Sequence, residues 1–219
     1  MKLEELHKEY DKLQQKYGAK ELDSIYYGGC TDHPDICFVF MNPTGRNIAA
    51  SKAWKGLKSP WIGTKNIWDL FYRLGLLDPE IYTEIRSMKG SEWTEEFASE
   101  VYENVKKHRY FITNLGKCTQ LDARPLPDCV YKKYLKLLET EIELIQPKVV
   151  VLFGNQVSSI VLGEKISVSQ CRCKLFKKCI NEKEYDCYSV FYPVGNGRFH
   201  IDKAIEDISY IIRTLKDKE

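Results

Sequence analysis

The chain has 219 residues, of which 43% are hydrophobic and 29% are charged. This balance is typical of a folded globular protein and excludes a largely disordered chain, and the length suits a single domain over residues 1–219. The formal net charge of +2 excludes a histone-like polycation but leaves room for a local basic face.

Helices and strands alternate along the sequence. Residues 2–17 carry apolar side chains at helical spacing, and four short runs rich in β-branched and aromatic residues predict strands at 36–41, 110–113, 149–153 and 188–192. Further helices are predicted at 67–74, at 130–145 and from residue 202 onward. No apolar run approaches the ~20 residues that a membrane helix needs, and the N-terminus lacks the apolar segment of a secretory signal. We therefore expect a cytoplasmic protein with no membrane partner.

This alternation predicts an α/β fold, specifically a three-layer sandwich with a short, mostly parallel four-stranded central sheet flanked by helices. The run 149–153 (VVVLF) is apolar on both faces, as expected of a central strand that is covered on both sides. Residues 78–108 predict a helical insertion on the surface of the sheet. The Cys-rich residues 171–187 predict a hairpin before the last strand.

Amide side chains and turn residues follow the predicted strands, at the sheet edge where open α/β sheets bind their ligands. The segments that follow them are 42–47 (NPTGRN), 114–118 (NLGKC), 154–156 (GNQ) and 193–198 (PVGNGR), and none contains a carboxylate. An amide both donates and accepts but does not titrate, which suits the edge of a nucleobase better than a reaction that needs a strong base. Any one of these asparagines is also explained by a turn. The glycine signatures of dinucleotide, P-loop and serine-hydrolase sites are absent from the sequence.

The same segments, in this order, resemble the uracil-DNA glycosylase superfamily. Residues 28–45 (GGCTDHPDICFVFMNPTG) are similar to the first-motif region of its thermophile-type branch, although MNPTG is closer to the mismatch-specific branch. Residues 59–76 (SPWIGTKNIWDLFYRLGL), 110–118 (YFITNLGKC) and 146–157 (QPKVVVLFGNQV) resemble further motifs, and FYPVGNGR stands where the last motif is expected.

The resemblance implies a DNA base-excision repair glycosylase that hydrolyses the N-glycosidic bond of uracil, or of a related deaminated base, flipped out of DNA. It places Asn42 at the catalytic position that holds a water, and Tyr192 where the thermophile-type branch has a histidine donor. Trp61 would stack on the base and Asn114 would hydrogen-bond its edge. Phe40 and Met41 fall at the base-binding motif. The residues assigned to DNA contact are Thr44, Lys117, Gly195, Asn196, Arg198 and His200. Five further basic residues are expected on the same face, namely Lys52, Lys55, Lys58, Lys65 and Arg124.

Two departures from the family pattern keep a second hypothesis open. Tyr192 replaces the last-motif histidine and Phe40 replaces the first glycine of the first motif, so the chain could be a catalytically weak or inactive nucleic-acid-binding protein of the same fold. Deaminated DNA is the expected partner under the first hypothesis, and a monomer is expected under both.

The eight cysteines raise a third hypothesis, a metal or redox protein. Disulfides are not expected in a reducing compartment. The thermophile-type branch binds an iron–sulfur cluster through four cysteines, but only Cys118 matches one of them, and Tyr134 stands near the fourth. The cluster of Cys171, Cys173, Cys179 and Cys187 has a poor spacing for zinc. We therefore expect no metal and no cofactor.

Overall fold

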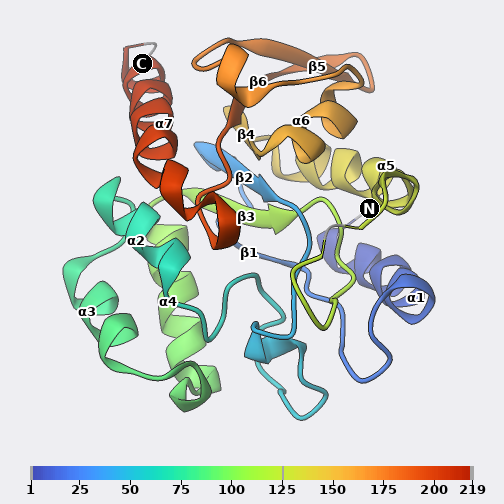
Figure 1. Ribbon diagram of the computed structural model, residues 1–219, viewed down its shortest axis with the longest axis vertical. Helices are drawn as coiled ribbons and strands as arrows, with labels where there is room; N and C mark the ends of the chain where they lie inside the picture. Colours follow the sequence, from blue (N-terminus) through green and yellow to red (C-terminus); the bar gives the residue numbers. More distant parts are fainter. Residues whose placement is uncertain (1, 125, 218–219) are drawn as a thin grey trace.

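The computed structural model describes residues 2–124 and 126–217 (Figure 1). Its strands are β1 (Tyr27–Gly29), β2 (Ile36–Phe40), β3 (Tyr110–Asn114), β4 (Val149–Phe153), β5 (Phe176–Ile180) and β6 (Lys183–Val190). Its α-helices are α1 (His7–Tyr17), α2 (Asn66–Arg73), α3 (Pro79–Ser87), α4 (Glu95–Lys107), α5 (Asp128–Ile145), α6 (Asn155–Leu162) and α7 (Ile201–Lys216). Short 3-10 helices are η1 (Leu3–Leu6), η2 (Ile48–Ala50), η3 (Gly90–Glu92), η4 (Val168–Gln170) and η5 (Gly195–His200).

Six strands of the described chain form one sheet in the order β1-β3-β2-β4-β6-β5. The four central strands are parallel to one another, and β1 and β5 pair antiparallel at the two edges. The α/β class is therefore confirmed, and the four predicted strands are the parallel ones. The prediction of four strands in total is wrong, because the sheet also has these two edge strands.

The edge strands had weak signals in the sequence. β1 has three residues, two of them glycine, and glycine is depleted in strands. β5 lies inside the Cys-rich segment 171–187, where a hairpin was predicted. That hairpin is part of the sheet, because β6 begins at Lys183 and pairs with β5 along its length. The chain reverses at Asn181 and Glu182, which both have positive φ.

Two helical layers cover the sheet. Helices α2, α3, α4 and α7 pack on one face, and α1, α5 and α6 pack on the other, so that the sheet lies between two apolar cores (Figure 1). All five residues of β4 are buried, as predicted for a strand covered on both faces. Among the described residues, no helix combines the length and the hydropathy needed to cross a bilayer.

Two segments differ in detail from the sequence analysis. Residues 78–108 are helical as expected, but α4 packs directly on β1 and β3 and adds Val101 and Val105 to the core, so this segment forms part of a main layer. Helix α6 was not predicted, and it begins at Asn155 directly after β4. Residues 154–156 therefore begin a helix, and no open loop follows β4.

Candidate functional site

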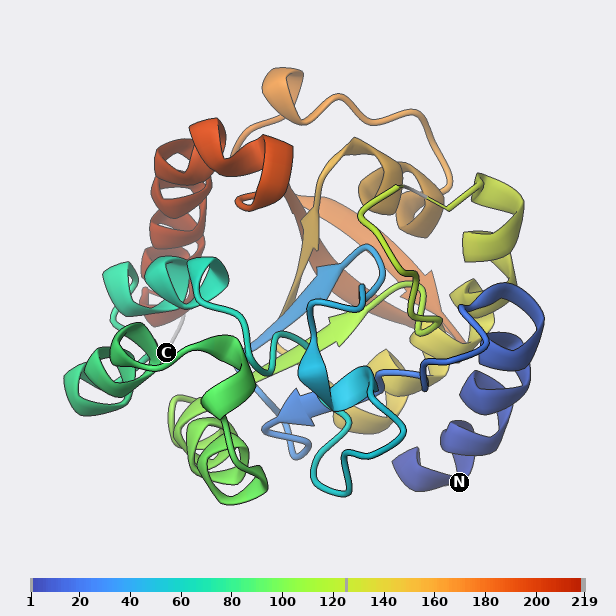
Figure 2. The ribbon, with the colours of Figure 1, turned by 60° about the horizontal axis from the view of Figure 1, so that its bottom comes forward.

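A cleft of about 510 Å³ opens at the carboxyl ends of β2, β3 and β6. The segment after β2 runs through η2 in front of the sheet (Figure 2) and forms much of the wall. The polar side chains lining it include Asn42, Thr44, Asn47, Asn66, Ser91, Asn114 and Tyr192, and the charged ones are Arg46 and Lys65. Because the described lining contains no carboxylate and no imidazole, the cleft offers neutral hydrogen-bonding groups with two cations beside them.

Main-chain hydrogen bonds join the segments that follow β2 and β3. The amide of Gly116 donates to the carbonyl of Met41 at 2.8 Å, and the amide of Gln120 donates to the carbonyl of Pro43 at 3.1 Å. Thr44 and Gln120 then form an isolated bridge. The two segments therefore continue the pairing of their strands, and this pairing fixes the position of Asn42 relative to Asn114.

Asn42 is half-buried, and both ends of its amide are bonded to the protein. Its Nδ2 donates to the carbonyl of Pro43 at 3.1 Å, and its Oδ1 accepts from the hydroxyl of Tyr131 at 2.6 Å. Tyr131 comes from α5 and is fully buried. An amide has two donor and two acceptor positions, so one N–H and one lone pair of Asn42 remain for a ligand.

Asn114 is the last residue of β3 and is only 2% exposed. Its Nδ2 is buried and has no partner in the described protein. A buried donor without an acceptor costs about 1–3 kcal/mol, and a bound polar group would remove that cost. Asn114 is therefore the strongest single indication that the cleft receives a ligand with a hydrogen-bond acceptor.

Trp61 forms an aromatic wall of the cleft. It has a left-handed backbone with φ of 69°, a conformation held by Thr64, whose amide and hydroxyl both donate to the Trp61 carbonyl. The indole meets the ring of Phe40 edge-on with the centroids 5.0 Å apart. A strained backbone held by its surroundings is common at functional sites.

Tyr192 follows β6 and lines the cleft. Its ring also meets Phe40 edge-on, at 6.2 Å between centroids. Burial raises the pKa of the Tyr192 hydroxyl, so that the group stays protonated at neutral pH and can donate. The chain turns tightly beyond it, and a Cβ on Gly197 would lie 1.9 Å from the Tyr192 carbonyl oxygen. The turn therefore requires glycine at this position.

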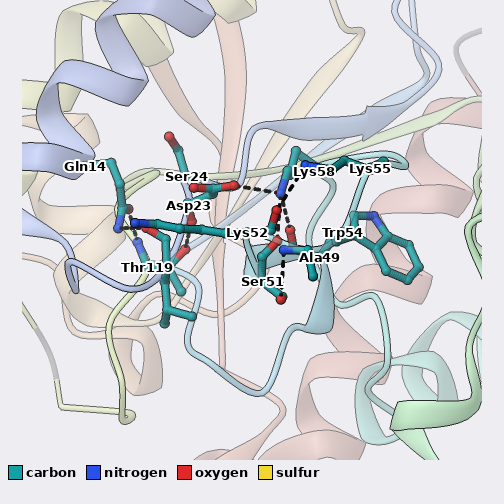
Figure 3. Close-up of polar contacts among 12 residues, drawn as sticks. Gln14, Asp23, Ser24, Ala49, Ser51, Lys52, Trp54, Lys55, Lys58 and Thr119 are labelled. Atoms are coloured by element: carbon teal, nitrogen blue, oxygen red, sulfur yellow. Dashed lines mark hydrogen bonds and ion pairs between the residues drawn. The ribbon is translucent and has the colours of Figure 1, made fainter.

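Within residues 47–61, Lys58 hydrogen-bonds the main chain of the same segment and ties it to Asp23 (Figure 3). Its Nζ forms an ion pair with Asp23 at 2.9 Å and donates to the carbonyls of Ala49 and Ser51 at 2.9 and 3.1 Å. Lys58 was expected to face DNA, but its contacts are internal. The ammonium groups of Lys52, Lys55 and Lys65 each donate to a main-chain carbonyl as well.

The structure brings six residues of the predicted site together at the cleft, namely Asn42, Thr44, Trp61, Asn114, Tyr192 and Gly195. Arg198 and His200 lie next along η5 and are exposed. The Arg198 guanidinium covers the ring of Phe199 at 4.8 Å. The side chain of Asn196 lies outside the described part of the structure.

Three predicted site residues lie elsewhere. Phe40 is fully buried and stacks on Phe153 at 4.2 Å, so it supports the aromatic wall from beneath and does not line the cleft. Met41 packs into the core on the opposite face of the sheet, because successive strand residues point to opposite faces. The assignment of these two side chains to base contact is therefore corrected.

The assignment of Lys117 to DNA contact is also wrong. Its side chain is 1% exposed, and its Nζ pairs with the fully buried Glu141 at 2.8 Å. Thr113 and Tyr10 complete this buried network. The lysine therefore neutralises a buried carboxylate beneath the sheet and does not reach the protein surface.

The cysteines are dispersed. All eight are free, and within the described residues no group of three or more His, Cys, Asp or Glu side chains is placed to hold a metal ion. The hydroxyl of Tyr134 adjoins the thiol of Cys118. A phenol therefore stands beside Cys118, near the position at which the sequence analysis noted a fourth cysteine in the thermophile-type branch.

Two contributions to the cleft were missed in the sequence. Tyr131 does not line the cleft but hydrogen-bonds the lining residue Asn42, from a helix whose apolar pattern marks that position simply as core. Gly90 and Ser91 come from the segment 78–108, which was assigned to the surface. No short motif marks either contribution, since both depend on long-range packing.

The arrangement defines a restricted chemistry. Neutral amides and a protonated phenol can orient a water molecule and donate to a developing anion, but they cannot act as a strong base at neutral pH. An aromatic wall beside them suits a planar ligand.

A comparison with protein families matches residues 27–212 to the model described as the uracil DNA glycosylase superfamily.

Proposed function

The chain belongs to the uracil DNA glycosylase superfamily, and on that ground we propose that it is a DNA base-excision glycosylase acting on uracil or a related deaminated base. The observation that carries the proposal is the cleft itself. Its lining combines Asn42, Asn114, Trp61 and Tyr192 with the cations Arg46 and Lys65.

Each group has a role that follows from the reaction. Breaking the bond between base and sugar leaves positive charge on the sugar and negative charge on the base, so catalysis requires a positioned water and donors to the leaving base. Asn42 would hold the water through its free lone pair. The protonated hydroxyl of Tyr192 would donate to the leaving base.

Base selection rests on Asn114 and Trp61. The unpartnered Nδ2 of Asn114 would donate to a carbonyl oxygen of the base, while its Oδ1 would accept from a ring N–H. Cytosine presents the opposite pattern, and unpaired buried polar groups disfavour a wrong base strongly. Stacking on Trp61 would add ~1–3 kcal/mol with little regard to base identity.

The test is excision from end-labelled oligonucleotides that carry uracil, hypoxanthine, xanthine or a G·T mismatch, single- and double-stranded. Alkali-labile abasic sites should appear with the wild-type protein and should form at strongly reduced but measurable rates with Asn42→Ala and Asn114→Ala. Gln170→Ala, an exposed residue of η4, is the matched control and should retain full activity.

A second candidate is a nucleic-acid-binding protein of the same fold without turnover. The observation that favours it is the absence of any carboxylate or imidazole among the described lining residues, which leaves the reaction without a strong base. Retained DNA binding with no abasic sites on any substrate would support this function and would reject the glycosylase.

A further inference from the structure

The hydroxyl of Tyr131 donates to Oδ1 of Asn42 at 2.6 Å, across a long sequence separation. The phenol comes from α5, on the far face of the sheet, and passes next to Gly116 in the segment after β3 to reach Asn42 behind the cleft lining. It has room to do so because that segment has a glycine at residue 116. A Cβ on Gly116 would lie 3.1 Å from the Tyr131 ring and 3.4 Å from the Asn42 Cβ.

The partners of Asn42 define which end of its amide is oxygen. The carbonyl of Pro43 can only accept, so the end that contacts it at 3.1 Å must be the NH2 group. The other end is therefore Oδ1, and Tyr131 must be its donor. A flipped amide would place two oxygens against each other at Pro43. Together the two contacts hold the amide plane at both ends.

This orientation matters for a water molecule. A water that donates to the free lone pair of Oδ1 keeps its own lone pair available for attack on carbon. A water that instead accepts from an N–H has committed that lone pair to the hydrogen bond. An asparagine has little basicity to offer, so orientation is its main means of activating water.

We propose that Tyr131 is a positioning residue that holds the amide of Asn42 in the orientation needed to present a nucleophilic water. The inference rests on the proposed function and adds to it a residue on α5. Tyr131 touches neither the base nor the water, and it acts through Asn42 alone. Burial raises the pKa of its phenol, which therefore remains a donor at neutral and mildly alkaline pH.

The test uses Tyr131→Phe, which removes the hydroxyl and keeps the ring that packs on Gly116. We expect the single-turnover excision rate to fall roughly three- to tenfold, the effect of one hydrogen bond, with the Kd for DNA unchanged. Tyr134→Phe is the matched control. It lies one turn along the same helix and is equally buried, but its hydroxyl adjoins Cys118, so its rate should equal that of the wild type.

Two further measurements separate positioning from a structural role. In an Asn42→Ala background, Tyr131→Phe should cause no additional loss of rate, because the group that it orients is gone. The side-chain amide NMR signals of Asn42, assigned by their loss in Asn42→Ala, should shift and exchange faster in Tyr131→Phe but not in Tyr134→Phe. The inference would be overturned if Tyr131→Phe lowered the rate equally in the wild-type and Asn42→Ala backgrounds. Unchanged amide signals of Asn42 in Tyr131→Phe would overturn it as well.

The same measurements distinguish failure of this inference from failure of the proposed function. If the wild-type protein cleaves no substrate, the glycosylase proposal is rejected, and Tyr131 could no longer be positioning a nucleophilic water. If the wild-type protein cleaves but Tyr131→Phe matches it in rate, the glycosylase proposal stands and only the role of Tyr131 is rejected.

Discussion

Lys117 and Glu141 form an ion pair that is closed to solvent, with Nζ and Oε1 2.8 Å apart and side chains 1% and 0% exposed. Lys117 belongs to the segment that follows β3, and Glu141 to α5. The pair therefore connects the segment carrying Asn114 to the helix carrying Tyr131, so that two parts of the candidate site share one buried anchor.

Removing one partner of this pair should be costly. Lys117→Met leaves the Glu141 carboxylate buried without its cation, and breaking a buried pair in this way typically costs about 3–5 kcal/mol. Urea unfolding should show a free energy of unfolding lowered by that amount, with a correspondingly lower midpoint. The double variant Lys117→Met/Glu141→Leu should recover part of the loss, since no charge is then left unpaired.

The same lysine provides a check on the DNA-binding surface. Because its ammonium is buried, Lys117→Met should leave the salt dependence of DNA binding unchanged. Arg198→Ala, in contrast, removes an exposed cation beside the cleft. If one phosphate contact is lost, this variant should reduce the slope of log K for DNA binding against log salt concentration by about 0.9. A reduced slope in the Lys117 variant would contradict its assignment to the interior.

Trp61 is expected to contribute mainly through its ring. Trp61→Ala should weaken kcat/KM on single-stranded uracil substrates by roughly 5- to 150-fold, the equivalent of ~1–3 kcal/mol of lost stacking. Trp61→Phe keeps a stacking surface and should retain most of the activity. A large loss in Trp61→Phe with an unchanged melting temperature would instead assign the contribution to the indole N–H, which has no partner in the described structure.

Two exposed apolar side chains lie next to the cleft-lining segments and predict a difference between duplex and single-stranded DNA. Phe199 is 76% exposed on η5, and Leu121 is 64% exposed in the loop after β3. If they fill the space vacated by a flipped base, their alanine variants should lose activity on duplex DNA only, because extrusion from a duplex costs a few kcal/mol that a single strand does not require.

Leu175→Ala is the control for this comparison, because Leu175 is also exposed but precedes β5, in the Cys-rich segment. It should lose activity on neither substrate. The free energy of unfolding of all three variants should lie within about 0.5 kcal/mol of the wild-type value, as expected for exposed sites. Equal losses on both forms of DNA would argue against a role in base extrusion.

The buried tyrosines predict that stability falls in alkali. Burial raises the pKa values of Tyr10, Tyr102, Tyr110, Tyr131, Tyr134 and Tyr192. Above about pH 10 the unfolded chain loses these protons while the folded chain keeps them. The unfolded state then binds fewer protons, so the free energy of unfolding decreases as pH rises, by up to ~1.4 kcal/mol per pH unit for each tyrosine.

Urea unfolding between pH 8 and pH 11 would measure this decrease directly. Absorbance at 295 nm should show the exposed phenols ionising first and the buried ones only as the protein unfolds. A single titration of all phenols near pH 10 in folded protein would contradict the prediction.

The sequence predicted the parallel part of the sheet because its signals are local. The run 149–153 is apolar at every position, and the structure buries all of it. The edge strands escaped prediction since β1 is short and glycine-rich, and β5 has two adjacent lysines at its centre and lies in a segment that looked like an independent hairpin.

The residues of the candidate site also divide into those that local sequence signals identify and those whose place depends on distant partners. Residues that directly follow a strand, such as Asn42 and Tyr192, fall at the cleft because strand ends determine their place. Lys117 also follows a strand, but its direction depends on Glu141, a partner on α5 that no local pattern identifies. Tyr131 was hidden for the opposite reason, because its position in α5 matches that of an ordinary core residue.

The two antiparallel edge strands also offer few pairing positions to a strand from another molecule. An open edge exposes unpaired amide and carbonyl groups that can recruit a strand from another chain. β1 is only three residues long and offers little length for such pairing. At the other edge β5 carries Lys177 and Lys178, which are ion-paired with Asp186 and Glu139, and charged side chains on an edge strand disfavour the addition of a further strand. The four parallel strands thus have no exposed edge of their own, and each of the two edge strands carries a feature that disfavours pairing with another chain.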